Sequence, residues 1–403
     1  MGTVVFLSKM VPEEHREWVE RNRIRGMFSS AVALQQKLLA GFDALIGEDL
    51  VVCNVEPVSN FPQHFRKMRV PGFRYDHTGG GGRQDYNVAF NNTVGLKQKS
   101  MERGVARTLE RIGREREISA LVIYTPTGFF LNAACRYAKR HPDLHICLII
   151  PDLPDFANLA EHISIKTRML MWLNNRSIQR AFARINSLVV LTAQTAEYLH
   201  WQGKPFAVVE GIASAPPVVT APQPEHPTIV YTGTTHRQFG IPVLLDAFAR
   251  IKDPDVRLVV CGEGDYDGEL CRLAQQDSRI RFLGVVSHEQ AIRLQHQATV
   301  LVNPRQNIGE YTKYSFPSKT MEYLVTGAPV VAYRLDGMPE EYFDYLCIPA
   351  DNTPRALAGT ISEILSMSGE ERRDMGRRGR EYVLTHKNPK QQVQKIVDLI
   401  NGR

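Results

Sequence analysis

Residues 316–332, FPSKTMEYLVTGAPVVA, combine residue types and spacing that suit an anion-binding helix start. Ser315 stands where an N-cap is expected, and Pro317 suits the first turn because its missing N–H group is not needed there. Ser318 and Thr320 bring hydroxyl groups close to the first backbone amides of the helix. Because these amides and the helix dipole attract anions, the stretch predicts a phosphate site.

Two charged side chains follow on this predicted helix. Lys319 would supply a point charge to the bound anion. Glu322 lies on the first full turn, where a carboxylate can accept two ribose hydroxyls. The helix should end at Gly327, before a buried strand at 328–333. The alternative for Glu322 is a surface acid that only stabilises the helix dipole.

Residues 230–248, VYTGTTHRQFGIPVLLDAF, predict a strand, a polar turn and a helix that begins near Ile241. Gly233 and Gly240 allow the backbone to approach a ligand closely, and the helix start offers free N–H groups. Arg237 adds a charge that can form a forked contact with phosphate. An ordinary turn is the alternative, because glycine is common in α/β turns.

Residues 258–270, LVVCGEGDYDGEL, repeat this pattern one unit later around Gly262 and Gly264. The acidic residues that follow favour a helix start and oppose a phosphate site. A contact from the turn to the base or ribose is possible on this pattern, and a structural turn is the stronger interpretation. The two Asp-x-Asp pairs, at 253–255 and 265–267, are interpreted as turn and helix-start residues, so we expect no metal site.

The first half of the chain offers further candidate ligand contacts. Asp152 and Asp155, in IIPDLPDF, follow a predicted strand and suit contacts to ligand hydroxyls, with a proline-rich turn as the alternative. The glycine loop at 77–83 ends in Arg83, which could meet an acceptor phosphate, although a disordered tip is the stronger interpretation. The segment 165–185 carries five basic residues and no acidic one, so it suits a helix on anionic lipid or a solvated basic face.

Charge and composition narrow the class of protein. Residues 1–210 carry 27 Lys and Arg against 20 Asp and Glu, which favours an anionic partner for that half. No apolar run approaches the length of a membrane-spanning helix, and the N-terminus shows no signal-peptide core, so a cytoplasmic location is expected. The six cysteines lack paired spacing, which predicts reduced core residues rather than disulfides or metal ligands.

These candidate residues need a scaffold of parallel sheets. Apolar strand-like runs alternate with amphipathic helical segments, which is typical of α/β units. The proline-rich stretch 211–227 reads as a linker. Two doubly wound domains with a ligand cleft between them are therefore expected. The predicted strands lie near 3–7, 50–55, 119–124, 145–150, 187–191 and 206–210, and near 228–232, 256–261, 279–283, 298–302, 328–333 and 345–348.

With these motifs in place, residues 228–385 closely resemble the nucleotide-sugar domain of family 4 glycosyltransferases, which are retaining enzymes of GT-B fold. The resemblance rests on YTGTTHRQFGIPVLLDAF, VRLVVCGEGDYDGEL, IRFLGVVSHEQAIRL and FPSKTMEYLVTGAPVVA. It implies that Glu322 is the second glutamate of the family's pair and holds the nucleotide ribose. The FPSK variant is similar to the subgroup that builds bacterial surface polysaccharides.

Three departures from this family pattern stand out. Tyr314 replaces the first glutamate of the pair, with Glu310 as a nearby substitute. Thr234 and Phe239 stand where the family has Arg and Lys, which leaves Arg237 and Lys319 to neutralise the diphosphate. The double-glycine loop expected after the first strand is replaced by FLSKMVPEEH, with Ser8 and Lys9.

The resemblance implies a retaining transferase that moves a hexose-type sugar from a nucleotide diphosphate sugar to a glycan or lipid-linked acceptor, with no cofactor, no metal and no nucleic-acid partner. Peripheral contact with the inner membrane face is expected. A non-catalytic partner subunit and a nucleotide-sugar epimerase are the alternatives.

The expected domains are 1–210, the linker 211–227 and 228–385, with a C-terminal helix at 386–403 that packs back towards the first domain. The expected site residues are Arg237 and Lys319 as catalytic groups; Gly233, Thr234, Gly262, Tyr314, Ser315, Pro317, Ser318 and Glu322 at the donor; and Asp152 and Asp155 at the acceptor.

Overall fold

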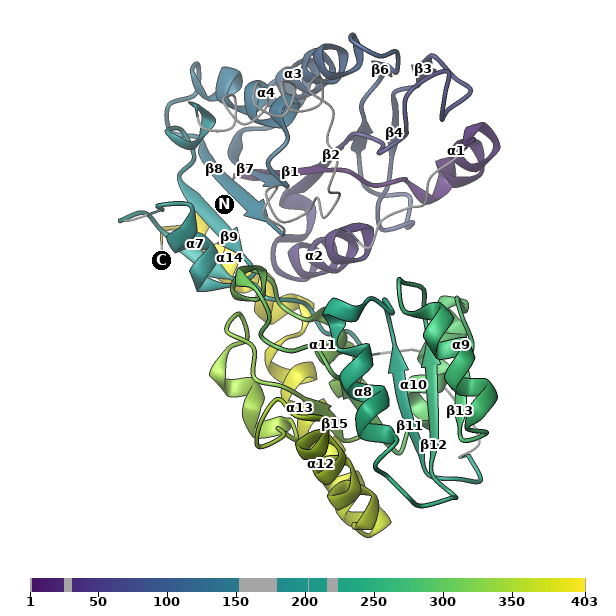
Figure 1. Ribbon diagram of the computed structural model, residues 1–403. Coiled ribbons are helices and arrows are strands. Elements are labelled where there is room, and N and C mark those ends of the chain that lie inside the picture. The colour runs from purple at the N-terminus through teal and green to yellow at the C-terminus, as the bar shows by residue number, and fades with distance from the viewer. Residues whose placement is uncertain (1, 25–30, 152–179, 202, 216–223, 403) are drawn as a thin grey trace. The chain divides into compact units, whose positions relative to one another are not determined.

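The computed structural model describes the whole chain except residues 1, 25–30, 152–179, 202, 216–223 and 403 (Figure 1). It divides into two compact units, Met1–Glu210 with Pro389–Arg403, and Gly211–Asn388. Each unit is a mixed α/β structure built on a mainly parallel sheet, so the predicted fold class of two Rossmann-like units is confirmed.

The first unit is built on an eight-stranded sheet in the order β10-β9-β8-β7-β1-β2-β5-β4. Apart from the antiparallel β4–β5 pair, its strands run parallel. The strands are β1 (Thr3–Ser8), β2 (Leu50–Asn54), β4 (Phe73–Tyr75), β5 (Asp85–Asn87), β7 (Ile118–Tyr124), β8 (His145–Ile150), β9 (Ser187–Val190) and β10 (Phe206–Val208); β3 (Arg69–Val70) pairs with β6 (Phe90–Asn91).

Helices cover both faces of this sheet. Figure 1 shows α3 (Lys97–Glu115) and α4 (Gly128–Ala138) on one face and α2 (Ala31–Ile46) on the other. The C-terminal helix α14 (Pro389–Ile400) packs against α2, and Lys395 Nζ donates to the Val208 carbonyl at 2.9 Å. Residues 389–403 therefore form part of the first unit. The described residues of this unit also form α1 (Arg16–Asn22) and α7 (Ala193–Tyr198), with 3-10 turns η1 (Glu13–His15) and η2 (Gly47–Asp49).

The second unit has a five-stranded parallel sheet in the order β13-β12-β11-β14-β15. Its strands are β11 (Thr228–Thr232), β12 (Arg257–Cys261), β13 (Ile280–Phe282), β14 (Val300–Asn303) and β15 (Val330–Ala332). Its helices are α8 (Ile241–Phe248), α9 (Asp267–Gln276), α10 (His288–Gln297), α11 (Ser318–Thr326), α12 (Pro354–Ser366) and α13 (Gly369–His386), with 3-10 turns η3 (Arg237–Phe239), η4 (Glu310–Lys313) and η5 (Glu340–Tyr345).

Strand alternation divides the core of the second unit between the two faces of its sheet. Ile229 and Tyr231 of β11 join a cluster with residues of α8 and α12, whereas Val230 joins a cluster with residues of α11 and α13. Successive strand residues point to opposite faces, so one apolar strand supplies both clusters. All the strands of this sheet run parallel, so their carboxyl ends meet at one edge.

Three parts of the sequence prediction differ from the structure. The strand predicted at 345–348 is a single bridge between Val331 and Cys347, because β15 is short and Pro349 offers no N–H group to continue the pairing. The short strands β3, β4, β5 and β6 were not predicted, because two or three residues carry no readable periodicity. The cysteines are free, but Cys271 is exposed, so the prediction of a core position is wrong for it.

Candidate functional site

Two glycine turns meet at the carboxyl edge of the second sheet. Gly233 follows β11 and Gly262 follows β12, and a Cβ atom on Gly262 would lie 1.7 Å from the Gly233 carbonyl oxygen. Gly233 N–H donates to the Cys261 carbonyl at 2.9 Å, and Gly262 N–H donates to the Gly284 carbonyl at 2.8 Å. The turns therefore pack backbone against backbone, in a space that no side chain at position 262 can share.

Further contacts fix the position of the first turn against the second. Thr235 N–H donates to the Glu263 carbonyl at 3.0 Å, and the Thr235 hydroxyl donates to the Asp267 carboxylate. A Cβ atom on Gly264 would lie 2.3 Å from the Thr235 carbonyl carbon. Asp267 begins α9, so its assignment as a helix-start residue is correct.

Helix α11 is held against the end of β11 by one buried phenol. The Tyr323 hydroxyl accepts from Thr232 N–H at 2.8 Å and donates to the Thr232 carbonyl at 3.1 Å. Tyr323 is fully buried, and this burial raises the pKa of its hydroxyl well above the usual range. The two hydrogen bonds place the first turn of α11 beside the Gly233 turn.

Helix α11 begins at a later residue than the sequence predicted. Helix α11 begins at Ser318 with Pro317 at the N-cap and no side-chain cap, so Ser315 is not the N-cap. The Ser315 hydroxyl instead accepts from Arg305 and donates to the Tyr311 carbonyl at 3.1 Å. The Thr320 hydroxyl is buried and accepts from Asn303 at 3.0 Å, so it does not face a ligand at the helix start.

Lys319 and Glu322 lie together on α11, where the sequence placed them. Lys319 Nζ is 2.8 Å from Glu322 Oε2, and their side chains are 39% and 41% exposed. Lys319 Cε would lie 3.6 Å from a Cβ atom on Gly233, so the lysine reaches over the first glycine turn. Burial raises the pKa of Cys261 at the end of β12, and the nearby Lys319 charge opposes this. The structure thus brings Gly233, Lys319 and Glu322 into one cluster.

Arg237 is an exposed residue of the loop that follows Gly233. It is exposed on η3, and its guanidinium lies over the Tyr266 ring at 4.8 Å from the centroid. Its backbone N–H donates to Asp265 Oδ1 at 2.8 Å. Arg237 therefore contacts the second turn, whereas Lys319 lies over the first. Thr234 is exposed, and its carbonyl accepts from the Tyr231 hydroxyl at 2.7 Å.

Tyr314 and Glu310, the two candidate replacements for the first glutamate of the family's pair, differ in their burial. Tyr314 is half-buried directly after η4. Glu310 is exposed and forms an ion pair with Lys313 at 3.6 Å. Ser318 is exposed at the first position of α11.

Sequence reasoning missed Arg305, which lies two residues after β14. The residue is 8% exposed, and its Nη2 donates to the Ser315 hydroxyl at 2.6 Å. Its guanidinium lies 4.8 Å from the Tyr311 ring centroid and 5.9 Å from that of Phe239, which stands where the family resemblance expects a lysine. Burial lowers the pKa of Arg305, and the phenols of Tyr311 and Tyr231 oppose this. A charged residue just past the carboxyl end of a parallel strand was the available sequence signal.

The acceptor-side predictions fall mostly outside the described residues. Asp152 and Asp155 lie outside the described residues, as does most of the basic segment 165–185.

At the end of β1, the Ser8 hydroxyl donates to Asn54 Oδ1 at 2.8 Å. Burial lowers the pKa of the neighbouring Lys9.

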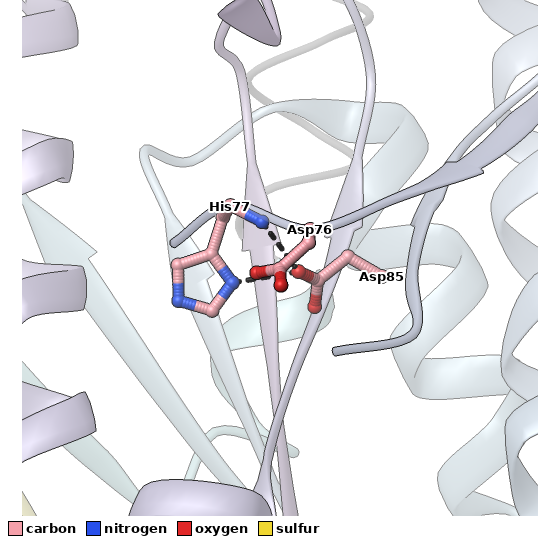
Figure 2. Close-up of side chains that lie close together, drawn as sticks. All are labelled: Asp76, His77 and Asp85. Atoms are coloured by element: carbon pink, nitrogen blue, oxygen red, sulfur yellow. Dashed lines mark hydrogen bonds and ion pairs between the residues drawn. The ribbon is translucent and has the colours of Figure 1, made fainter. Parts of the chain in front are cut away.

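A buried charge cluster lies beside the β4–β5 hairpin of the first unit (Figure 2). His77 Nδ1 is 2.6 Å from Asp85 Oδ2, and His77 Nε2 is 3.0 Å from Asp43 Oδ2. Arg83 forms an ion pair with Asp43 at 2.9 Å and donates to the Gly47 carbonyl, so its predicted role at an acceptor phosphate is not supported. Burial lowers the pKa of His77, but hydrogen bonds and the charges of Asp43 and Asp85 raise it to about 9.

Asp76, His77 and Asp85 have ligand atoms within 4.8 Å of one another, a spacing that could hold a metal ion. Both ring nitrogens of His77 already face carboxylates, and a protonated imidazole is not a metal ligand. Burial raises the pKa of Asp76, but hydrogen bonds from Thr78, Arg83 and Gly82 outweigh it and hold the pKa below the usual range. These contacts favour a satisfied structural network over a metal site.

Comparison with known proteins matches part of this chain to one family. Residues 226–367 match the family model described as glycosyl transferases group 1, and this segment includes the Gly233 turn, Arg305, Lys319 and Glu322. A search of curated proteins finds no match.

Solved structures match along the whole chain. Sucrose-phosphate synthase from Thermosynechococcus elongatus has a TM-score of 0.59 at 15% identity, over 99% of this chain and 98% of its own. The lipopolysaccharide outer core galactosyltransferase WaaB has a TM-score of 0.58 at 12% identity, over 99% of each chain. HepE from Anabaena in complex with UDP has a TM-score of 0.58 at 14% identity, over 100% of each chain. The chain therefore has the GT-B fold.

Proposed function

We propose that the chain is a retaining glycosyltransferase that moves a hexose-type sugar from a nucleotide diphosphate sugar to a glycan or lipid-linked acceptor. The observation that carries this proposal is the position of Lys319 and Glu322 on the first turns of α11, with Lys319 over the Gly233 turn. The GT-B fold and the family match over 226–367 support it.

The ion pair between Lys319 and Glu322 suits donor binding. Both side chains are partly exposed, and such ion pairs contribute at most about 1 kcal/mol. Replacing this ion pair by contacts to a ligand therefore costs little free energy. In the proposed complex Glu322 accepts the ribose hydroxyls and Lys319 turns to the diphosphate. Gly262 lets the two turns pack backbone against backbone, which sets the position of the Gly233 turn below Lys319.

In the proposed reaction the bond between the anomeric carbon and the phosphate oxygen breaks, and a bond to the acceptor oxygen forms on the same face of the sugar. Negative charge develops on the departing diphosphate. Lys319, Arg237 and the amides at the start of α11 stabilise this charge, which is the main task of the site. We propose that this stabilisation needs no metal ion.

The FPSK sequence supports a role in surface polysaccharide synthesis, in the family 4 subgroup that it resembles. WaaB, a protein of similar fold, is a lipopolysaccharide outer core galactosyltransferase. Asp152 and Asp155 are proposed to hold acceptor hydroxyls. The excess of basic residues in 1–210 suits peripheral contact with an anionic membrane on its cytoplasmic face. Within the described ranges, no helix has the length and apolar character that crossing a bilayer requires.

A second candidate function is that of a non-catalytic partner subunit that keeps the fold without transfer. Tyr314 in place of a glutamate favours it, since Glu310 is exposed and paired with Lys313. An epimerase is less well supported, because the cluster on α11 contains a single carboxylate, that of Glu322.

A transfer assay separates these candidates. Nucleotide sugars with α-linked glucose, galactose and N-acetylglucosamine are incubated with the protein and glycan acceptors, and the product anomer is read by NMR. An α-linked product supports the retaining transferase, and a β-linked product contradicts it. Nucleotide binding without transfer or hydrolysis supports the non-catalytic subunit, and an epimerised donor supports the epimerase.

A further inference from the structure

Arg305 is a buried charge without a carboxylate partner. It is 8% exposed, and within the described residues no Asp or Glu lies within ion-pair distance of its guanidinium. Its Nε atom is buried and has no hydrogen-bond acceptor there. Its Nη2 atom donates to the neutral Ser315 hydroxyl at 2.6 Å, and the phenol of Tyr311 is a second neutral neighbour.

Two other poorly exposed arginines among the described residues are neutralised. The side chain of Arg83 is 12% exposed and lies 2.9 Å from Asp43, and that of Arg279 is 17% exposed and lies 2.7 Å from Asp277. Arg279 also lies over an aromatic ring, that of Phe248, as Arg305 lies over Tyr311. Arg279 thus combines ring stacking with a carboxylate, whereas Arg305 has the ring alone.

A buried charge without a counter-ion is unfavourable, because the lost hydration is not replaced. The rings of Tyr311 and Phe239 stabilise the guanidinium but leave its charge in place. An oxyanion bound to Arg305 would supply both the missing charge and the missing acceptor. Guanidinium groups are well suited to phosphate and carboxylate for this reason.

The position of Arg305 points to the donor as the source of that anion. A Cβ atom on Gly240 would lie 1.9 Å from the carbonyl oxygen of Pro304, so the first glycine turn packs on the residue before Arg305. Phe239 belongs to that turn, and Ser315 lies three residues before α11. Arg305 therefore connects the two segments that carry Gly233 and Lys319.

We propose that Arg305 binds an oxyanion of the donor and acts as a specificity-determining residue of the site. This inference rests on the proposed nucleotide-sugar function. Two groups of a donor have this chemistry, the phosphate next to the sugar and the carboxylate of a uronic acid sugar. In either case the ligand completes an ion pair that the protein lacks.

The test compares Arg305→Met with one control variant. Arg279→Met removes a guanidinium of similar burial that already has a carboxylate partner. Binding of pyrophosphate and of nucleoside diphosphates of uracil, guanine and thymine is measured by calorimetry. For the base that binds most tightly, the nucleoside monophosphate, the glucose donor and the glucuronic acid donor are added.

If the phosphate is the ligand group, Arg305→Met weakens pyrophosphate and diphosphate binding at least about tenfold, or about 1.4 kcal/mol, and changes monophosphate binding less. If the carboxylate is the ligand group, Arg305→Met weakens the binding of the glucuronic acid donor alone. Arg279→Met keeps wild-type affinities within about twofold. Equal affinities of wild type and Arg305→Met for all these anions would overturn the inference, as would a wild type that binds none of them.

A second readout separates binding from a structural role. Without ligand, Arg305→Met should unfold at the same temperature as wild type or higher, because it removes an uncompensated buried charge. A marked loss of stability together with unchanged affinities would assign Arg305 to packing alone. If pyrophosphate distinguishes wild type from Arg305→Met while Glu322→Ala binds nucleotides like wild type, the nucleotide-sugar function fails and the anion site stands.

Discussion

Lys319 Nζ lies 2.8 Å from Glu322 Oε2, within one turn of the helix that faces the Gly233 turn. The two residues carry the opposite charges that a nucleotide diphosphate requires, a cation for phosphate and a carboxylate for ribose. In the structure the two side chains form an ion pair with each other. We propose that nucleotide binding exchanges this ion pair for two ligand contacts, and each residue can be tested separately.

Replacing Lys319 with Met should slow transfer more than it weakens nucleotide binding. Lys319 is proposed to stabilise charge that develops on the departing diphosphate, and removal of one such donor costs about 2.7–4 kcal/mol of barrier, or roughly 10²–10³ in kcat. The measurement is kcat with saturating donor. Lys313→Met is the control, since Lys313 is partly exposed beside Glu310. A kcat within threefold of wild type would exclude Lys319 from the charge-stabilising role.

The backbone contact between the two glycine turns predicts opposite effects at two nearby glycines. Gly262→Ala would place a methyl group 1.7 Å from the Gly233 carbonyl oxygen, so it should lower the free energy of unfolding by about 3 kcal/mol or more. Gly268→Ala in α9 meets no atom within 4 Å and should raise it by about 0.5–1 kcal/mol. Urea unfolding followed by circular dichroism measures both. Equal stabilities would contradict the packing of the two turns.

The His77 cluster predicts that the first unit loses stability as the pH rises. The pKa of His77 is raised from 6.5 to about 9, so between these values the folded state holds a proton that the unfolded state has released. The stabilisation is complete below pH 6.5 and is lost as the pH rises through 9. One pKa unit corresponds to about 1.4 kcal/mol, so the loss amounts to a few kcal/mol at most.

Tryptophan fluorescence is a suitable probe of this loss, because Trp18, Trp172 and Trp201 all belong to residues 1–210. Urea unfolding between pH 6 and pH 9.5 should show a falling free energy in wild type and a flatter profile in His77→Gln. The exposed His64 provides the control His64→Gln, which should keep the wild-type profile. Parallel profiles for wild type and His77→Gln would show that His77 does not carry the pH dependence.

Chelation tests the proposed absence of a metal requirement. Transfer in the presence of EDTA should equal transfer in buffer alone, because Lys319, Arg237 and the helix amides are proposed to neutralise the diphosphate. Addition of Mg²⁺ after chelation serves as the control. Loss of transfer with EDTA and its recovery with Mg²⁺ would contradict this mechanism.

The sequence predicted the scaffold of the second unit well because its strands are continuous apolar runs between glycine turns. LVVCG and TIVYTG leave little choice of element, and the helix end at Gly327 follows from its left-handed conformation. The segment at 345–348 has a similar composition but meets only one residue of β15, at Val331. The number of residues that a segment pairs depends on the length of its partner strand. The periodicity of the segment itself does not show this.

The placement of the candidate site residues was predicted in part. Lys319 and Glu322 lie together on α11 as expected, because a helix start fixes where residues on its first turns point. Ser315 was assigned as N-cap from its residue type, but Arg305 and Tyr311 engage its hydroxyl. Arg305 was missed because the sequence shows its charge but not its burial, and burial without a carboxylate is what makes it informative.

The central claim, that α11 binds a nucleotide sugar, is tested most directly by thermal unfolding of wild type and Glu322→Ala with UDP-, GDP- and TDP-sugars. A ligand at 100 times its dissociation constant adds about 2.7 kcal/mol, which should raise the melting temperature by several degrees. Glu289→Ala, which removes an exposed glutamate of α10, is the control. The account predicts a shift with one donor that Glu289→Ala keeps and Glu322→Ala loses. No shift with any donor, or an equal shift in Glu322→Ala, would contradict it.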